Sequence, residues 1–241
     1  MTLGIMQPYF FPYIGYWQLI KASDEFILFD DVQYIRHGWI NRNRIIKPKE
    51  GWIYITVPLK KHSREDIIKN ISASDNVNWS DVLFNPLKTY EKTAPFYSET
   101  LYIIGNILKK INDNEIKSIT KINHTIIAEL CSYLNINTKI TVSSHHNFDY
   151  YSVNGAGDWA LEISKQKKAS AYINPISGRE LFDKEKFSSN DINILFLKPQ
   201  EITYNQKRKT FEPWLSIIDV LMFNGREETI KFLNYCDITE A

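Results

Sequence analysis

The chain has 241 residues, with 29 Lys and Arg against 28 Asp and Glu, so its formal net charge is +1. This balance argues against a protein whose main task is binding nucleic acid. Cys131 and Cys236 lie outside any CxxC or Cys/His cluster, which excludes a disulfide scaffold and suits a reducing compartment. The apolar start lacks a basic region and a cleavage site, and no apolar run reaches about 18 residues. We therefore expect a cytoplasmic protein with no membrane span.

The first thirty residues predict a strand, a loop, a helix and a second strand. Residues 2–6 form a short apolar run, and Pro8 and Pro12 make the next segment a loop. Residues 13–22 have the pattern of a helix, and residues 26–29 form another apolar run. This order is typical of a βαβ unit, which implies a parallel sheet with a right-handed crossover.

The rest of the chain predicts further strands around a helical segment. Residues 52–59 are β-branched and aromatic, as in a strand. Apolar residues recur at helical spacing over residues 80–135, which indicates three helices in an insertion or subdomain. We therefore predict one α/β domain over residues 1–241, with a mostly parallel sheet of Rossmann-like type. The later part of the chain predicts strands at residues 139–142, 171–173 and 192–197 and helices at 158–167, 214–223 and 227–233.

The loop after the first predicted strand is the first candidate site. Ligands of open α/β sheets bind beyond the carboxyl ends of the strands. Gln7, Tyr13, Gly15 and Tyr16 occupy that position next to a helix N-terminus, which favours an anion such as phosphate. Gly15 would allow a ligand to approach closely. The alternative is that the aromatic residues cap the sheet without binding anything.

Two carboxylates, Asp30 and Asp31, follow the second predicted strand and form the second candidate. Carboxylates in this position often bind a ribose hydroxyl or a metal ion. Adjacent residues at a strand end point in opposite directions, so we expect one of the two to face the site. The alternative role for the pair is turn formation and helix capping.

Residues 36–44 form the third candidate, a dense set of hydrogen-bond donors with one indole ring. Arginine binds phosphate through two parallel hydrogen bonds, and tryptophan can stack on a base or a sugar face. A solvated, salt-bridged loop and an RNA-binding loop are the alternatives. The residues predicted to bind substrate here are Trp39, Asn41, Arg42, Asn43 and Arg44.

Cations directly after the strand at residues 52–59 form the fourth candidate. Lys60 and Lys61 are placed to bind a diphosphate or another anionic group, and His62 can act as an acid or base near neutral pH. Gly178 lies in a turn after a later strand and is a further binding candidate. We predict no metal site, and the sequence requires no cofactor. An acyl or aminoacyl donor and Mg²⁺ are left open.

Several stretches resemble WbqC-like proteins, and the similarity covers nearly the whole chain. Residues 6–16 (MQPYFFPYIGY), followed by residues 29–33 (FDDVQ), which include Gln33, resemble the opening of that family. Residues 39–45 and 56–60 continue the resemblance. The resemblance implies a role in bacterial surface-polysaccharide or O-antigen biosynthesis, in which the protein acts on a sugar that is linked to a nucleotide.

The leading hypothesis is a transferase that adds an acyl or aminoacyl group to the amine of a nucleotide-linked amino sugar. In this hypothesis Arg42 and Arg44 bind the diphosphate, and Asp30 or His62 accepts the proton from the attacking amine. One alternative is a non-catalytic protein that binds a nucleotide sugar or acts as a scaffold.

Nucleotidylyl transfer is another alternative, based on a distant similarity of fold to the nucleotidylyl transferases. Those proteins carry a His-x-Gly-His helix start where this chain has residues 13–16 (YIGY). Tyrosine, with a pKa of about 10, cannot act as a cation at neutral pH. The expected partner is a phosphorylated small molecule, and the oligomeric state is left open.

Overall fold

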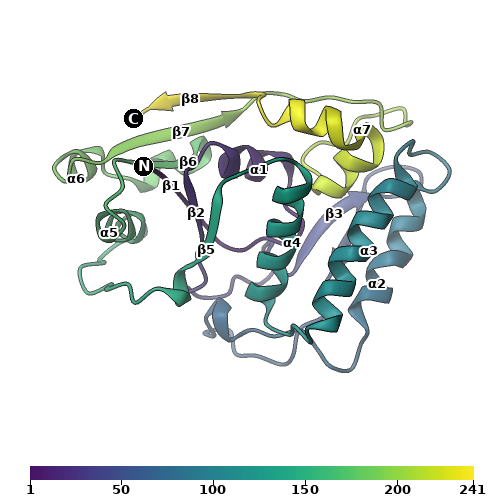
Figure 1. Cartoon of the computed structure of the whole chain (residues 1–241), viewed down its shortest axis with the longest axis horizontal. Helices are drawn as coiled ribbons and strands as arrows, with labels where there is room; N and C mark the ends of the chain where they lie inside the picture. The colour runs from purple at the N-terminus through teal and green to yellow at the C-terminus, as the bar shows by residue number, and fades with distance from the viewer.

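A computed structural model describes the backbone of residues 1–241 and all side chains except that of residue 81 (Figure 1). Its centre is a six-stranded sheet in the order β5-β2-β1-β6-β7-β8, in which only β8 runs antiparallel to its neighbour. The mixed α/β class and the mostly parallel sheet are therefore confirmed. The strands are β1 (Thr2–Met6), β2 (Glu25–Leu28), β5 (Lys139–Val142), β6 (Ala171–Pro175), β7 (Asn193–Pro199) and β8 (Cys236–Glu240).

The direction in which strands are added to the sheet reverses between β1 and β6. From β1 the chain adds β2 and β5 on one side, and then β6 and β7 on the other. In open α/β sheets such a switch point opens a crevice at the carboxyl ends of the two central strands. Here that crevice begins at Met6, which ends β1, and at Pro175, which ends β6.

Helices cover both faces of the sheet (Figure 1). The strands supply alternate residues to the two faces: Phe26 and Leu28 pack into the larger core, and Ile27 packs into the smaller one. Strands buried on both sides have continuous apolar runs, which is why the sequence revealed them. The larger core lies under α1 (Ile14–Lys21), α4 (Ile119–Tyr133) and α7 (Ile217–Phe232), and the smaller one under α5 (Asp158–Gln166) and α6 (Lys184–Ser188).

The predicted helical segment contains three α-helices. On α3, buried residues recur every three or four positions from Thr100 to Ile111, and α3 packs against α4 and α7. The apolar residues of these helices belong to the same core cluster as those of α1. The elements of this segment are α2 (Trp79–Leu87), the 3₁₀ turn η2 (Lys88–Tyr90), α3 (Tyr97–Asp113) and α4. Among the described residues, no helix is long and apolar enough to span a bilayer.

A separate hairpin of β3 (Arg42–Ile46) and β4 (Trp52–Thr56) lies beside the main sheet. No strand was predicted at residues 42–46, because the buried positions there alternate with arginines and one of them is itself polar. Asn43 and Ile45 are buried, whereas Arg42 and Arg44 lie on the outer face. The predicted strand at residues 52–59 is shorter, and it pairs with β3 instead of joining the main sheet.

The C-terminal part of the chain differs from the prediction in several further respects. The predicted helix at residues 214–223 begins only at Ile217, because Ser216 caps it by accepting a hydrogen bond from the backbone N–H of Ile218. The predicted helices at residues 214–223 and 227–233 are the two parts of α7, which is kinked at Gly225, where φ is 67°. The edge strand β8, which is largely exposed, and the short helix α6 were not predicted. The remaining turns are η1 (Ile68–Asn70), η3 (Ser143–His145) and η4 (Ile176–Leu181).

Candidate functional site

The loop that follows β1 is fixed by side chains that bind its backbone carbonyls. Asn43 donates from Nδ2 to the carbonyls of Phe10 (3.0 Å) and Phe11 (2.8 Å). The Tyr16 hydroxyl donates to the carbonyl of Gln7 at 2.8 Å. Tyr16 is buried in the core, where this hydrogen bond helps to fix the conformation of the loop. It lines neither of the two cavities described below.

A cavity of about 370 Å³ opens at the switch point, and we call it the switch-point cavity. Its walls are largely aromatic, which suits the flat face of a sugar or a base. Burial raises the pKa of Tyr9 and of Tyr13, so both hydroxyls stay protonated at neutral pH and can donate hydrogen bonds. The lining residues are Met6, Tyr9, Tyr13, Trp39, Asn43, Arg44, Pro175, Ser177 and Trp214.

Arg44 supplies the positive charge of the switch-point cavity. Its guanidinium carbon lies 5.3 Å from the centre of the Trp39 ring and 5.1 Å from that of Trp52. The Nη2 atom donates to the backbone carbonyl of Trp214 at 3.3 Å. Stacking on two indole rings holds the guanidinium in place, and no carboxylate of the described residues pairs with it. The charge of Arg44 is therefore available to an anionic ligand.

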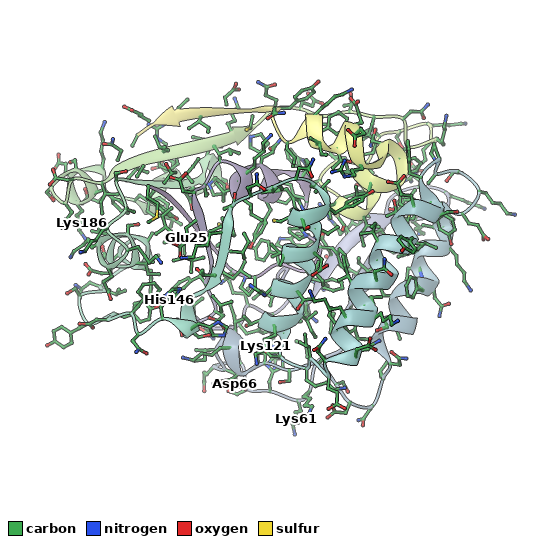
Figure 2. All side chains as sticks on the ribbon, viewed as in Figure 1. Glu25, Lys61, Asp66, Lys121, His146 and Lys186 are labelled. Atoms are coloured by element: carbon green, nitrogen blue, oxygen red, sulfur yellow. The ribbon has the colours of Figure 1, made fainter. Side chains whose placement is uncertain are left out.

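A second cavity of about 520 Å³, the basic cavity, lies along the same hairpin. Arg42 is fixed there by donation to the carbonyls of Gly38 and His37, with its guanidinium carbon 4.1 Å from the centre of the Tyr54 ring. Figure 2 shows Lys61 at the lower edge of the molecule, on the segment that follows β4. Among the described side chains, no Asp or Glu lines this cavity, whose lining consists of Tyr34, Arg36, His37, Asn41, Arg42, Thr56, Pro58, Leu59, Lys60, Lys61 and His62.

His62 is the residue of the basic cavity best suited to accept a proton. Its Nδ1 lies 2.9 Å from the backbone carbonyl of Ser63. A carbonyl can only accept, so Nδ1 carries the hydrogen in this contact and Nε2 has a free lone pair. The ring of Tyr34 packs edge-on at 4.9 Å, and its hydroxyl donates to Oδ1 of Asn41 at 2.7 Å.

The two cavities lie next to each other because of strand geometry. Arg42 and Arg44 are two positions apart on β3, so both lie on its outer face. Positions two apart on a strand are separated by about 7 Å. One lines the basic cavity and the other lines the switch-point cavity. A ligand of moderate length can therefore contact both arginines.

The structure places Asp30 and Asp31 away from both cavities. Asp30 is 1% exposed, and its carboxylate accepts hydrogen bonds from the Ser143 hydroxyl (3.0 Å) and from the backbone and hydroxyl of Ser144 (3.0 and 2.9 Å). Asp31 instead pairs with Lys69 at 2.9 Å. The neighbouring carboxylates have different partners, as strand geometry predicts, and Asp30 ties β2 to β5.

The two predicted glycines make room for neighbouring side chains. A Cβ on Gly15 would lie 2.4 Å from Cε2 of Tyr13, and one on Gly178 would lie 2.3 Å from Nδ2 of Asn174. Gly15 therefore admits the Tyr13 ring, which lines the switch-point cavity, and not the ligand itself. The exposed Gln33 donates to a backbone carbonyl at Arg64. The lining of the two cavities does not include Gln7, Gly15, Tyr16, Asp30, Asp31, Gln33 or Gly178.

Five residues of the switch-point cavity were not among the predicted site residues: Met6, Tyr9, Pro175, Ser177 and Trp214. Tyr9 and Ser177 lie in the segments that follow β1 and β6, where ligand binding was predicted. Trp214 follows Pro213 in a polar stretch and is 54% exposed. A tryptophan within a polar segment is therefore the sequence feature that could have identified Trp214 as a binding residue. Among the described side chains, no group of three His, Cys, Asp or Glu is placed to hold a metal ion.

These features define an open α/β protein with an aromatic, arginine-bearing cavity at the switch point of its sheet. The chain belongs to the WbqC-like protein family, which matches residues 7–231. It is also similar to a protein of Mycobacterium tuberculosis (strain ATCC 25618 / H37Rv) named "Uncharacterized protein Rv1507c". The two are 29% identical over 236 residues, which cover 97% of this chain and 98% of the relative. No solved structure matches the chain.

Proposed function

We propose that this protein is a transferase of bacterial surface-polysaccharide biosynthesis that acts on a nucleotide-linked amino sugar. The sugar and its phosphates occupy the switch-point cavity, and an acyl or aminoacyl group is transferred to the sugar amine. The observation that carries this proposal is Arg44, a cation that lies against Trp39 and Trp52 and pairs with no carboxylate among the described side chains. Arginine suits phosphate, and the aromatic walls suit a sugar face. Membership of the WbqC-like family agrees with this role.

The strand order supports a Rossmann-like sheet, distantly related to that of the nucleotidylyl transferases. Numbered along the chain, the five parallel strands follow the order 3-2-1-4-5, which matches the order of dinucleotide-binding folds over these five strands. Such sheets bind nucleotides at the switch point, where Tyr9, Tyr13 and Arg44 line the cavity.

The reaction needs a base for the attacking amine, and we assign that role to His62. The amine nitrogen attacks the carbonyl carbon of an activated donor, such as an acyl thioester or an aminoacyl ester. The new C–N bond forms as the bond from that carbon to the leaving sulfur or oxygen breaks. Nε2 of His62 takes the amine proton and returns it to the leaving group. Asp30 is less suited to this step, because its carboxylate is buried and fully hydrogen-bonded.

The second candidate function is a non-catalytic carrier or scaffold that binds the same nucleotide sugar. It is favoured by the lining of the switch-point cavity, which has no histidine and no carboxylate. Nucleotidylyl transfer has less support, because Tyr16 is buried in the core and donates to a backbone carbonyl.

We further propose that the protein works in the cytoplasm on a phosphorylated small molecule. The free thiols of Cys131 and Cys236 support a reducing compartment. The net charge of +1 gives little support to nucleic acid as the partner.

The test of binding is calorimetric titration with UDP-, GDP- and dTDP-linked amino sugars. Arg44→Gln should weaken binding by roughly 10- to 100-fold, because a charge-assisted hydrogen bond contributes about 1.5–3 kcal/mol. Arg64→Gln makes the same charge change on an exposed residue outside both cavities and should leave affinity unchanged. Equal affinities in the two variants would contradict the role of Arg44.

Transfer is tested separately by mass spectrometry of the sugar after incubation with acyl thioesters and aminoacyl esters. Formation of the N-acyl sugar, and its loss in His62→Ala with binding retained, is the result expected of the transferase. A sugar that binds tightly and is never modified would instead support the carrier.

A further inference from the structure

A third cavity, of about 560 Å³, lies at the carboxyl end of β7, and we call it the β7 cavity. Lys198 and Pro199 end the strand and line the cavity together with Gln200, which follows them. Ile14, at the start of α1, forms another part of the wall. Because β7 pairs with β6, this cavity lies along the same edge of the sheet as the switch-point cavity.

The walls of the β7 cavity are apolar and aromatic, whereas its rim is polar. Tyr204 and Phe211 contribute two rings whose centres are 5.1 Å apart, packed edge to face. At the rim, Nε2 of Gln200 donates to Oδ1 of Asp237 at 2.9 Å. Glu201 forms no ion pair within the described part of the chain. A nucleobase needs this combination, since its faces stack on aromatic rings and its edge carries both donors and acceptors.

Trp214 is shared by the β7 cavity and the switch-point cavity. Its backbone has a φ of 58°, a left-handed conformation that bulky residues rarely adopt. The ring packs edge-on against Tyr13, with 5.8 Å between ring centres, and its carbonyl accepts the hydrogen bond from Arg44. A ligand that extends from one cavity into the other therefore crosses Trp214 beside the Arg44 guanidinium.

We infer that the β7 cavity binds the base of the nucleotide-linked sugar, with Trp214 as the common wall between the base and the sugar. In this arrangement the phosphates cross Trp214 next to Arg44, and the sugar lies in the switch-point cavity. An aliphatic acyl chain fits less well, because three of the walls are aromatic and the rim carries four polar side chains. The inference rests on the proposed function, since it takes a nucleotide-linked sugar as the ligand.

The test compares two ligands that differ in whether they carry a base. One is the tightest-binding nucleotide sugar among the UDP-, GDP- and dTDP-linked amino sugars, and the other is glucosamine 1-phosphate. Phe211→Leu keeps an apolar side chain but removes a stacking surface, and it should weaken nucleotide-sugar binding about 10-fold. Binding of glucosamine 1-phosphate should be unchanged. Gln200→Ala, on an exposed rim residue, is a second variant that leaves the packed wall intact and should give the same pattern.

Arg44→Gln makes failure of the inference distinguishable from failure of the proposed function. That variant should weaken both ligands, because both carry phosphate. If Phe211→Leu and Gln200→Ala affect neither ligand, or both ligands equally, the base does not bind in the β7 cavity and the inference is overturned. If the wild-type protein binds none of the nucleotide sugars, the proposed function fails and the inference fails with it.

Discussion

Replacing Asp219 with asparagine should remove a distinctive pH dependence from the stability of this protein. Asp219 is fully buried on α7, where it accepts hydrogen bonds from the hydroxyls of Tyr90 (2.6 Å) and Tyr204 (2.7 Å) and from Nε2 of Gln206 (2.9 Å). Burial raises its pKa from the ordinary 3.8 to about 6, although the three donors lower it. The native protein therefore binds a proton at Asp219 more tightly than the unfolded chain does.

The direction of the effect follows from this difference in proton binding. A raised carboxyl pKa contributes stability that is fully present below 3.8 and is lost as the pH rises through about 6. Each pKa unit corresponds to about 1.4 kcal/mol, so the total change is about 3 kcal/mol. The asparagine of the Asp219→Asn variant does not titrate, so position 219 contributes no pH dependence to the stability of that variant.

Urea unfolding at a series of pH values between about 3 and 8 measures this contribution directly. The unfolding free energy of the wild type, minus that of Asp219→Asn, should fall by about 3 kcal/mol across the range. Subtraction removes the effect of the other carboxylates. Asn147→Ala, a change on an exposed residue without a titratable group, should give a flat difference. A flat or rising difference for Asp219→Asn would refute the reasoning.

Two further substitutions test how the switch-point cavity is built. Asn43→Ala leaves two carbonyls of the loop at residues 7–13 without their donor. It should lower the free energy of unfolding, measured with urea, by about 2–4 kcal/mol. The control, Asn147→Ala on an exposed residue, should change that free energy by less than about 0.5 kcal/mol. Gly15→Ala places a methyl group against the Tyr13 ring, and should cost about 1–3 kcal/mol of stability and weaken nucleotide-sugar binding in calorimetric titration. Unchanged affinity in Gly15→Ala would show that the position of the Tyr13 ring does not affect nucleotide-sugar binding.

The parallel sheet was predictable because its strands are buried on both faces. Such strands appear in the sequence as short apolar runs, and the loop after each run marks the edge where ligands bind. Trp39 and Arg44 were predicted as binding residues from their side-chain chemistry, and both line the switch-point cavity. The pattern of apolar runs did not reveal β3, where Arg42 and Arg44 alternate with the buried Asn43 and leave only Ile45 and Ile46 as an apolar run.

The partners of individual site residues could not be predicted, because they lie far away in the sequence. Asp30 follows a strand, as a catalytic carboxylate often does, but its partner Ser143 lies 113 residues further along the chain. Trp214 lies 170 residues from Arg44, whose hydrogen bond it accepts. Local patterns specify which segments form strands and helices, whereas these contacts depend on how the segments come together.

The contacts around Ser216 also determine when the switch-point cavity can form during synthesis. Ser216 binds the carbonyl of Phe11 through its hydroxyl and the carbonyl of Arg44 through its backbone N–H. These contacts join segments separated by up to 205 residues. Chains are made from the N-terminus, and distant contacts form slowly. The ribosome must therefore release the segment around Trp214 before the walls of the cavity are complete.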